Sequence, residues 1–164
     1  MDELASRQYP VQEDMAFQRR MWAVQRVGWV LLGVISLAAL FGLFGYGALS
    51  KRTATGAEMS VEYEHFERAT RRAAFVFLFA ASATTERRLH LSQAFQEGFE
   101  ISSIQPLPLR SSGDADGIDL TFAVTPSAAS QVVIWARPHR YGTIGIKARL
   151  DDTRPLDFRV FIYP

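Results

Sequence analysis

The sequence predicts a mainly β protein, in which an N-terminal transmembrane α-helix is followed by an antiparallel immunoglobulin-like β-sandwich. Two observations carry this prediction. The first is an uncharged, largely apolar stretch over residues 27–49. The second is a series of short segments at 58–164 in which apolar and polar residues alternate, with turn-forming residues between them. A chain of 164 residues has room for one such domain and an anchor.

The uncharged stretch is long enough to cross a bilayer. A helix over 27–49 would be roughly 35 Å long, whereas the hydrocarbon core is about 30 Å thick. It lacks the polar face that a buried helix of a small soluble domain would keep. A cleaved signal peptide would have a shorter leading segment and an apolar core of about 7–15 residues. We therefore expect a signal anchor.

The positive charges beside this helix bear on its orientation. Residues 1–26 are expected to form a cytoplasmic arm, partly helical, and they include the cluster Arg19, Arg20 and Arg26. Lys51 and Arg52 follow the stretch, so the positive-inside count is nearly balanced. The short leading segment with its arginine cluster favours an N-terminus in the cytoplasm and a C-terminal domain outside.

Aromatic and small residues suggest two further roles for the helix. Trp22 and Trp29 are expected to lie at the headgroup level, where they and the arginine cluster would act as interfacial anchors. Ala38, Gly42 and Gly45 lie on one face, and small residues allow two helix backbones to approach closely. These three residues are candidates for helix packing.

The domain is expected at 58–164, after a linker at 50–57. Alternation or dense apolar composition predicts seven or eight strands, within residues 59–65, 73–80, 89–91, 99–105, 118–124, 132–136, 144–150 and 156–162. Residues 92–98 suggest a brief helical turn, with Ser92 as N-cap and Gly98 as terminator. The remaining stretches, including 111–117 and 151–155, are expected to be turns.

The segment 73–80 is apolar on both faces, although a strand in a two-layer sandwich needs only one apolar face. Phe75, Phe77 and Phe79 lie on one face, and Val76 and Leu78 on the other. The second face could be covered by the short helix at 92–98, by another chain or by the membrane surface. Cover from within the chain is favoured, and Val76 and Leu78 are otherwise a possible partner surface.

No catalytic or metal-binding arrangement emerges. The chain has no cysteine, and its histidines, His65, His90 and His139, lack metal-ligand spacing; His65 is expected on the buried face of a strand. Asp114, Asp116 and Asp119 could coordinate a cation, but a solvated hairpin loop is the more ordinary explanation. We therefore expect no cofactor, no metal and no enzyme activity.

Two arginine pairs flank the segment 73–80. Arg71–Arg72 precede it and Arg87–Arg88 follow it, and acidic residues lie near both pairs in the sequence. They could contact lipid phosphates, since each cation near an anionic surface contributes about 1 kcal/mol. A solvated polar rim is the more ordinary role. With a net charge of only +1, there is no basic surplus to suggest nucleic-acid binding.

Several segments carry a resemblance to a known family. They are WAVQRVGW at 22–29, GLFGYGALS at 42–50, VEYEHF at 61–66, GFEISSIQP at 98–106 and the terminal FIYP. In these the chain resembles a family of small bacterial single-pass membrane proteins with an extracytoplasmic β-domain. The resemblance implies an inner-membrane location and companionship with YetF-type membrane proteins.

Together these observations favour a non-enzymatic accessory or interaction protein of the bacterial cytoplasmic membrane. It would be a subunit or partner of a larger inner-membrane assembly, so its partners would be the lipid bilayer and another membrane protein, or a second copy. The alternative is a membrane-tethered ligand-binding or envelope-sensing domain.

Overall fold

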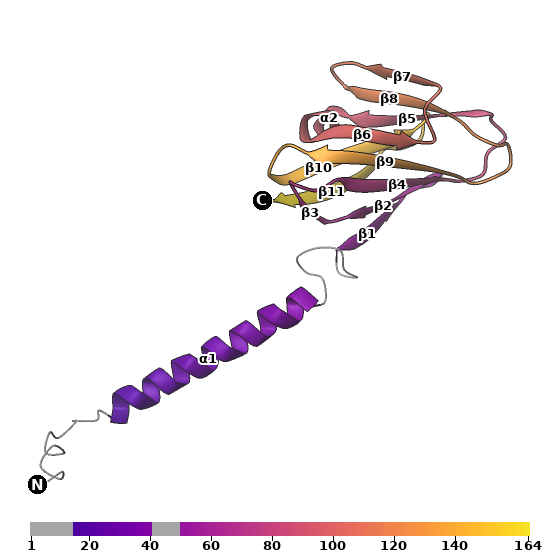
Figure 1. Cartoon of the computed structure of the whole chain (residues 1–164). Helices are drawn as coiled ribbons and strands as arrows, with labels where there is room; N and C mark the ends of the chain where they lie inside the picture. Colours follow the sequence, from indigo (N-terminus) through magenta and orange to yellow (C-terminus); the bar gives the residue numbers. More distant parts are fainter. Residues whose placement is uncertain (1–14, 41–49) are drawn as a thin grey trace, which may run out of the picture. The chain divides into compact units, whose positions relative to one another are not determined.

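The computed structural model describes residues 15–40 and 50–164 (Figure 1). It comprises a helical unit and a β-domain, which are described separately. The chain thus has the N-terminal helix and the β-rich domain that the sequence predicts.

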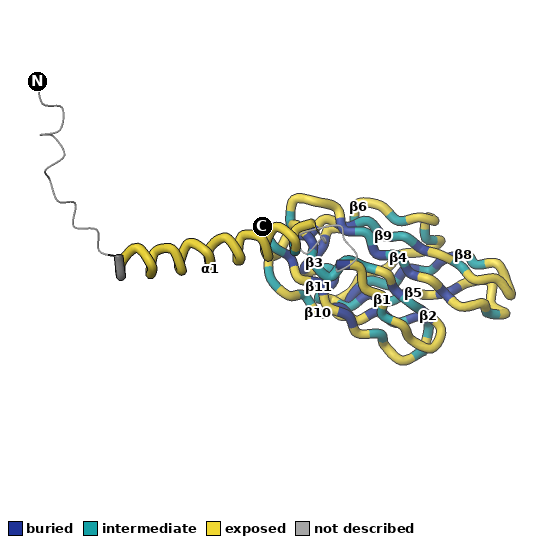
Figure 2. Tube along the Cα trace, turned by 90° about the horizontal axis from the view of Figure 1, so that it is seen from below, coloured by how far each residue is buried: buried dark blue, intermediate teal, exposed yellow. Residues whose placement is uncertain are grey.

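The helical unit is a single helix, α1 (Met15–Leu40), which begins within the expected arm. Its segment from Phe17 to Leu40 is long and apolar enough to cross a membrane, with a mean hydropathy of 1.7. From Phe17 to Leu40, all residues except Ala38 are exposed (Figure 2). Apolar side chains without protein cover are what a lipid-facing helix presents. The second part of the expected span, 41–49, lies outside the described residues.

The β-domain contains two sheets, whose strands are labelled in Figure 1. The five-stranded sheet has, in order, β1 (Lys51–Thr55), β2 (Met59–Glu64), β4 (Ala73–Phe79), β9 (Ser130–Pro138) and β6 (Phe99–Gln105). The six-stranded sheet has β3 (Phe66–Arg68), β11 (Leu156–Tyr163), β10 (Gly142–Leu150), β5 (Glu86–Ser92), β8 (Gly117–Ala123) and β7 (Arg110–Gly113). The described part of the chain therefore has more strands than the sequence predicted.

One pairing differs from the antiparallel prediction. The chain leaves the first sheet at the end of β2 and enters the second through His65, so that β3 runs parallel to β11. The pair has Phe66 opposite Phe161 and Glu67 opposite Ile162. A three-residue strand with no alternation of its own gives too little pattern to predict its direction. This crossing places Glu67 close to the end of β2 in the first sheet.

The core lies between the two sheets and is rich in phenylalanine. Phe75, Phe77 and Phe79 of β4 are fully buried, as their alternation predicts. Phe75 lies 6.1 Å from Phe158 of β11, ring centre to ring centre, so the two sheets are in contact. Burying one such side chain stabilises the fold by about 1.5–3 kcal/mol. The phenylalanine face of β4 is therefore the main contact between the layers.

A short helix, α2 (Gln93–Gly98), closes the core and confirms the helical turn predicted at 92–98. Phe95 stacks on Phe99 with ring centres 5.3 Å apart and is fully buried. Ser92 is the N-cap residue, as predicted, but its hydroxyl makes no capping hydrogen bond and accepts one from the Lys147 amide at 3.1 Å instead. Gly98 is the last residue of the helix, and its lack of a side chain leaves room for Ile144, whose Cδ1 would lie 2.4 Å from an added Cβ.

The expected linker at 50–57 is wrong for most of its length, because β1 occupies Lys51–Thr55. It pairs with β2 along its whole length, from Lys51 opposite Glu64 to Thr55 opposite Ser60. Only Ala54 packs against the core, so this edge strand shows little hydrophobic alternation. The domain therefore begins about seven residues earlier than predicted.

The expectation that Arg87 belongs to a solvated rim is also wrong. Arg87 is only 2% exposed, because it shares the core-facing side of β5 with Leu89. Its Nη2 lies 2.5 Å from Glu58 Oε2, and its Nε lies 2.6 Å from Asp151 Oδ2. The guanidinium thus joins the β1–β2 turn of one sheet to the β10–β11 turn of the other. Arg88 and the pair at 71–72 are exposed, as predicted.

Candidate functional site

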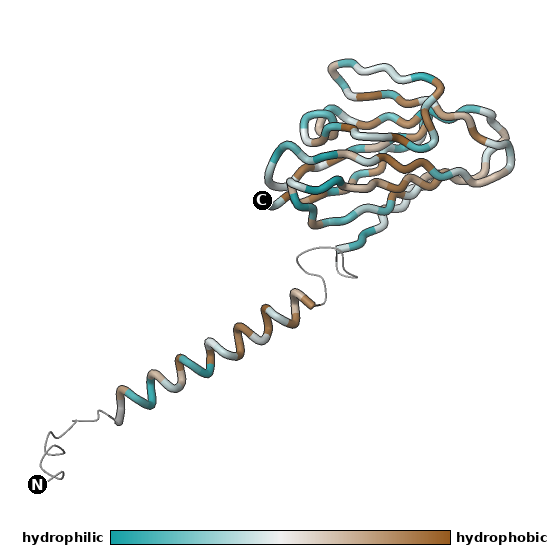
Figure 3. Tube along the Cα trace, viewed as in Figure 1, coloured by the Kyte–Doolittle hydropathy of each residue, from teal (hydrophilic) through white to brown (hydrophobic). Residues whose placement is uncertain are grey.

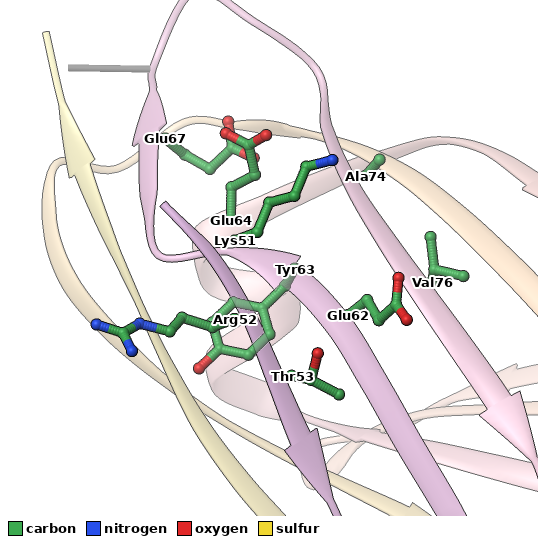
Figure 4. Close-up of a pocket in the computed structure, with 9 residues that line it drawn as sticks. All are labelled: Lys51, Arg52, Thr53, Glu62, Tyr63, Glu64, Glu67, Ala74 and Val76. Atoms are coloured by element: carbon green, nitrogen blue, oxygen red, sulfur yellow. The ribbon is translucent and has the colours of Figure 1, made fainter. Parts of the chain in front are cut away.

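The outer surface of the five-stranded sheet has a hollow of about 430 Å³ at the end of β2 (Figure 4). Strands β1 to β4 all contribute to it. The residues that line it are Lys51, Arg52, Thr53, Glu62, Tyr63, Glu64, Glu67, Ala74 and Val76. We call it the acidic pocket, because three glutamates line it. Glu62 is exposed, Glu64 is half-buried and Glu67 is buried.

Glu67 is the unusual member of the acidic pocket. The residue is only 4% exposed, and among the described residues its carboxylate makes no hydrogen bond or ion pair. The carboxylate keeps access to solvent through the pocket, because Arg149 Nε alone among the described side-chain atoms is fully buried without a hydrogen-bond partner. Burial, and after it the nearby Glu64, raise the pKa of Glu67 to about 7, against the opposing charge of Arg71. A buried carboxyl without a partner binds a proton more tightly because its charged form has lost water. Glu67 is therefore close to half ionised at neutral pH.

Glu64 is the second carboxylate of this end, and in Figure 4 its side chain lies next to that of Glu67. Burial raises its pKa too, against a hydrogen bond from Ser50 and the charges of Lys51 and Arg71. The Ser50 hydroxyl is 3.4 Å from Glu64 Oε2. The two carboxylates thus form a negative site with one stabilised member and one that lacks a partner.

Ser50 connects this site to the beginning of the domain. It is fully buried, its carbonyl accepts from the His65 amide at 2.7 Å, and its hydroxyl accepts from the Phe66 amide at 3.3 Å. These bonds fasten the first described residue of the domain to the corner between β2 and β3. The chain that comes from α1 therefore enters the domain directly beside Glu64 and Glu67.

The floor of the acidic pocket is apolar and continues along the sheet. Ala74 and Val76 of β4 form the floor, and Leu78 follows on the same face. On β9, Trp135 lies opposite Ala74 and Val133 lies opposite Val76. We call these five side chains the apolar strip. In Figure 3 the hydrophobic colour runs along β4 at this place.

The apolar strip corrects one expectation and supports another. Cover from within the chain is expected for Val76 and Leu78, but α2 does not supply it, because Phe95 packs inside the core on Phe75 at 5.4 Å. Leu78 is 37% exposed, and Val76 is half-buried. Among the described residues, Leu78 is thus open and Val76 is only partly covered. Trp135 was missed as a member because its segment is uniformly apolar, so periodicity could not assign its face.

The histidines have ordinary structural roles. His65 lies between β2 and β3, partly exposed rather than on a buried face, and its Nδ1 is 3.0 Å from the Arg159 carbonyl oxygen. His90 Nδ1 is 2.9 Å from Asp119 Oδ1 across the β5–β8 pair. His139 is exposed beyond the end of β9, in the expected turn. Within 15–40 and 50–164, no group of three histidine or carboxylate side chains could hold a metal ion.

The three aspartates do not meet at one point. Asp114 and Asp116 lie in the tight turn between β7 and β8, where Asp114 Oδ1 accepts from the Asp116 amide at 2.8 Å. Asp119 lies further along β8. The predicted turn at 111–117 is shorter than expected, because β7 extends to Gly113. The hairpin explanation for the acidic cluster agrees with this geometry.

The helix residues selected from the sequence are only partly described. Arg19, Arg20, Trp22, Arg26, Trp29 and Ala38 lie on α1. The Arg26 guanidinium lies 3.5 Å from the centre of the Trp22 ring, one turn away on the helix. Gly42 and Gly45 lie outside the described residues, so the helix-packing face stays a prediction.

Comparison with protein-family models finds no match, and none of the curated proteins matches the sequence. The family resemblance therefore stays a prediction, and the arguments that follow depend on the geometry alone.

Glu67 should make the stability of the domain depend on pH. Its pKa in the folded state, about 7, lies above the ordinary value of 4.5. The folded state therefore binds the proton more tightly, and its stability decreases as the pH rises from about 4.5 to about 7. The full shift corresponds to roughly 3 kcal/mol, and solvent at the open side of the pocket reduces this figure.

The substitution Glu67→Gln should remove most of this decrease and leave a more stable domain at pH 8. Denaturant unfolding of the full chain in detergent micelles, followed by circular dichroism between pH 5 and pH 8, measures the effect. Glu100→Gln changes an exposed carboxylate on β6 and should keep the wild-type profile. A Glu67→Gln profile as steep as that of the wild type would contradict the assignment.

Proposed function

We propose that this chain is a non-enzymatic, membrane-anchored accessory protein that docks on another membrane protein through the apolar strip. In this proposal α1 spans the bacterial cytoplasmic membrane, with the N-terminus inside and the β-domain outside. The domain acts as an immunoglobulin-like sandwich, that is, as a rigid two-sheet scaffold for contact. Its phenylalanine core supports this role, although the parallel β3 departs from the usual immunoglobulin arrangement.

The observation that carries the proposal is the difference between the two outer sheet faces. The outer face of the six-stranded sheet is mostly polar, with Arg88, His90, Asp119, Thr121, Lys147, Arg149, Asp157 and Arg159 on its central strands. The apolar strip instead crosses the two central strands β4 and β9 of the other sheet. A contiguous apolar group on a soluble domain is typical of an interaction site.

Trp135, at the Ala74 end of the apolar strip, is a residue of the kind that dominates binding energy. Its side chain is half-buried between Ala74 of β4 and Ser103 of β6. Tryptophan is enriched among the few interface residues whose removal costs about 2 kcal/mol or more. Val76 and Val133 continue the apolar surface from Trp135, and Leu78 lies at the other end of the strip. The strip is thus suited to receive apolar side chains from a partner.

The occupant that we propose is an extramembrane segment of another integral membrane protein, with apolar side chains next to a lysine or arginine. The carboxylates of Glu62 and Glu64 border the strip on the β2 side and would attract such a cation. Five side chains are fewer than the roughly 20–30 residues a side of a standard interface. Joint anchoring in one bilayer raises the effective concentration and compensates for a small contact.

A photo-crosslinking experiment tests this proposal. Benzoylphenylalanine in place of Leu78 should produce an adduct with one integral membrane protein when cells are irradiated. The same probe in place of Phe161 is the matched control, because Phe161 is 39% exposed on the other sheet. Trp135→Ala should reduce the Leu78 adduct by at least about tenfold, since an interface tryptophan of this kind contributes on the order of 2 kcal/mol.

The outcomes separate the alternatives. Loss of the adduct in Trp135→Ala, together with no adduct from position 161, supports docking on the strip. An adduct only with a second copy of the chain contradicts the proposed partner and indicates self-association. Equal adducts from both positions, or none from position 78, contradict the docking face.

A second candidate function is ligand binding or sensing by the tethered domain. The buried and unpartnered Glu67 favours this function, because a structural carboxylate at such a position would normally have a hydrogen-bond partner.

A further inference from the structure

We propose that the acidic pocket binds a ligand that carries a primary ammonium group on a short apolar stem. The ammonium would lie between Glu64 and Glu67, and the stem would lie on Ala74 and Val76. The inference goes beyond docking on the apolar strip. The two sites share Ala74, Val76 and Glu64, and Glu67 belongs to the amine site alone. It starts from Glu67, a buried carboxylate that faces the pocket without a partner (Figure 4).

The two carboxylates would be stabilised by a cation that also donates hydrogen bonds. Burial of an ionised carboxylate is costly unless hydrogen bonds and an opposite charge compensate for the lost water. An ammonium group supplies one positive charge and three hydrogen-bond donors. The Ser50 hydroxyl is 3.4 Å from only one of the two carboxylates, so the donor capacity of the site is not filled from within the described chain. A cationic donor would stabilise both carboxylates in their charged form.

Within residues 15–40 and 50–164, no lysine or arginine forms an ion pair with Glu64 or Glu67. Lys51 is exposed on β1, opposite Glu64, and forms no ion pair with either carboxylate. Arg71 is close enough to lower the pKa of both groups, but it does not line the pocket. The titratable and charged groups around Glu67 are Glu62, Tyr63 and Glu64 of β2, Lys51 and Arg52 of β1, Arg71, and Tyr163 of β11.

The rest of the pocket selects an organic cation over a metal ion. Its carboxylates do not form a group of three that could hold a metal. Ala74 and Val76 offer aliphatic surface for a short alkyl stem. Arg52 and Thr53 of β1 also line the pocket and could contact an anionic end of the same ligand. The chemistry therefore fits an aminoalkyl group, with or without a phosphate or carboxylate at its far end.

Two sources could supply this group. One is a free amine in solution. The other is the aminoethyl headgroup of a phosphatidylethanolamine lipid, which the proposed anchoring makes available, since Lys51 follows the end of α1 by eleven positions. The shared chemistry is the proposal, and the two sources are separated by experiment.

The first arm of the test uses n-butylamine as the probe. The full chain, with ¹³C-labelled glutamate, is held in detergent micelles at pH 7.5, and NMR follows the Glu67 carboxyl signal. We expect a saturable shift of this signal and a lower apparent pKa of Glu67 when butylamine is bound. Tetramethylammonium has the charge but no N–H donor, so its affinity should be at least about tenfold weaker.

Variants assign the response to the pocket. Glu67→Gln keeps the shape and removes the charge, so the response, followed at Glu64, should weaken at least about tenfold. Glu64→Gln should weaken the response at Glu67, and Glu100→Gln should leave it unchanged. Circular dichroism of each variant verifies that the domain is folded.

The second arm places the chain in nanodiscs of phosphatidylcholine with or without phosphatidylethanolamine. A change at Glu67 that requires phosphatidylethanolamine supports the lipid source, and a response to butylamine in micelles supports a free amine. The absence of both responses overturns the proposal, and so does a butylamine response that persists in Glu67→Gln. Crosslinking at Leu78 is independent of these outcomes, so the two proposals can fail separately.

Discussion

Removal of the two carboxylates that hold Arg87 is expected to lower the free energy of unfolding by about 3–5 kcal/mol. The double variant Glu58→Gln/Asp151→Asn leaves the guanidinium 2% exposed and without an opposite charge. A buried cation without a partner is costly because neither water nor a carboxylate compensates for its charge. Asparagine tolerates the positive φ of 50° at Asp151, so the backbone is not strained further.

The effect should be strongly asymmetric. Arg87→Leu leaves Glu58 and Asp151 at the surface, where they are 51% and 38% exposed and can be hydrated, so it should cost less than the double variant. Asp152→Asn, which affects an exposed contact of 3.5 Å with Arg88, should cost less than about 1 kcal/mol. Denaturant unfolding of the full chain in micelles measures each value. A double variant no more costly than Asp152→Asn would show that Arg87 becomes hydrated.

Gly117→Ala should destabilise the domain by about 3 kcal/mol or more, because a backbone penalty and a steric penalty combine. Gly117 has a φ of +150°, which residues with a Cβ rarely adopt. An added Cβ would also lie 2.1 Å from the carbonyl oxygen of Leu91, in the neighbouring strand β5. Backbone at this distance must move apart, and the β5–β8 pair would be disturbed at its end.

Two other glycines provide graded controls. Gly142 has a φ of +98°, and a Cβ added there would meet no atom within 4 Å, so Gly142→Ala should show the backbone penalty alone, roughly 1 kcal/mol. Gly145 has neither constraint, and Gly145→Ala should be close to neutral. The expected order of stability is therefore Gly145→Ala, Gly142→Ala, Gly117→Ala. Equal losses for the first and last variants would contradict the steric argument.

Both predictions concern places where the two sheets or their strands are fixed by single residues. Arg87 connects a turn of each sheet, and Gly117 allows the close approach of β5 and β8. Neither place is part of the acidic pocket or of the apolar strip. Their variants therefore measure the scaffold and leave the two proposed sites unchanged.

The sequence by itself determined the parts of this protein that depend on local periodicity. The apolar helix before residue 41 follows from composition alone, because a long uncharged apolar stretch is typical of a membrane-spanning helix. The strands with clear alternation, such as those containing Phe75 and Ile146, were predictable because one face of each meets the core. The phenylalanine face of β4 was therefore predictable as the main buried surface.

Only the tertiary structure decided the features that depend on distant segments. Lys51–Thr55 is a strand because it pairs with β2, and its own sequence buries only Ala54. Arg87 is buried because Glu58 and Asp151, 29 and 64 positions away, supply its counter-charges. The acidic pocket exists because the crossing from β2 to β3 brings Glu67 beside Glu64 and leaves it without a partner. Such contacts join segments that are distant in the sequence, and the local alternation of apolar and polar residues does not predict which segments meet.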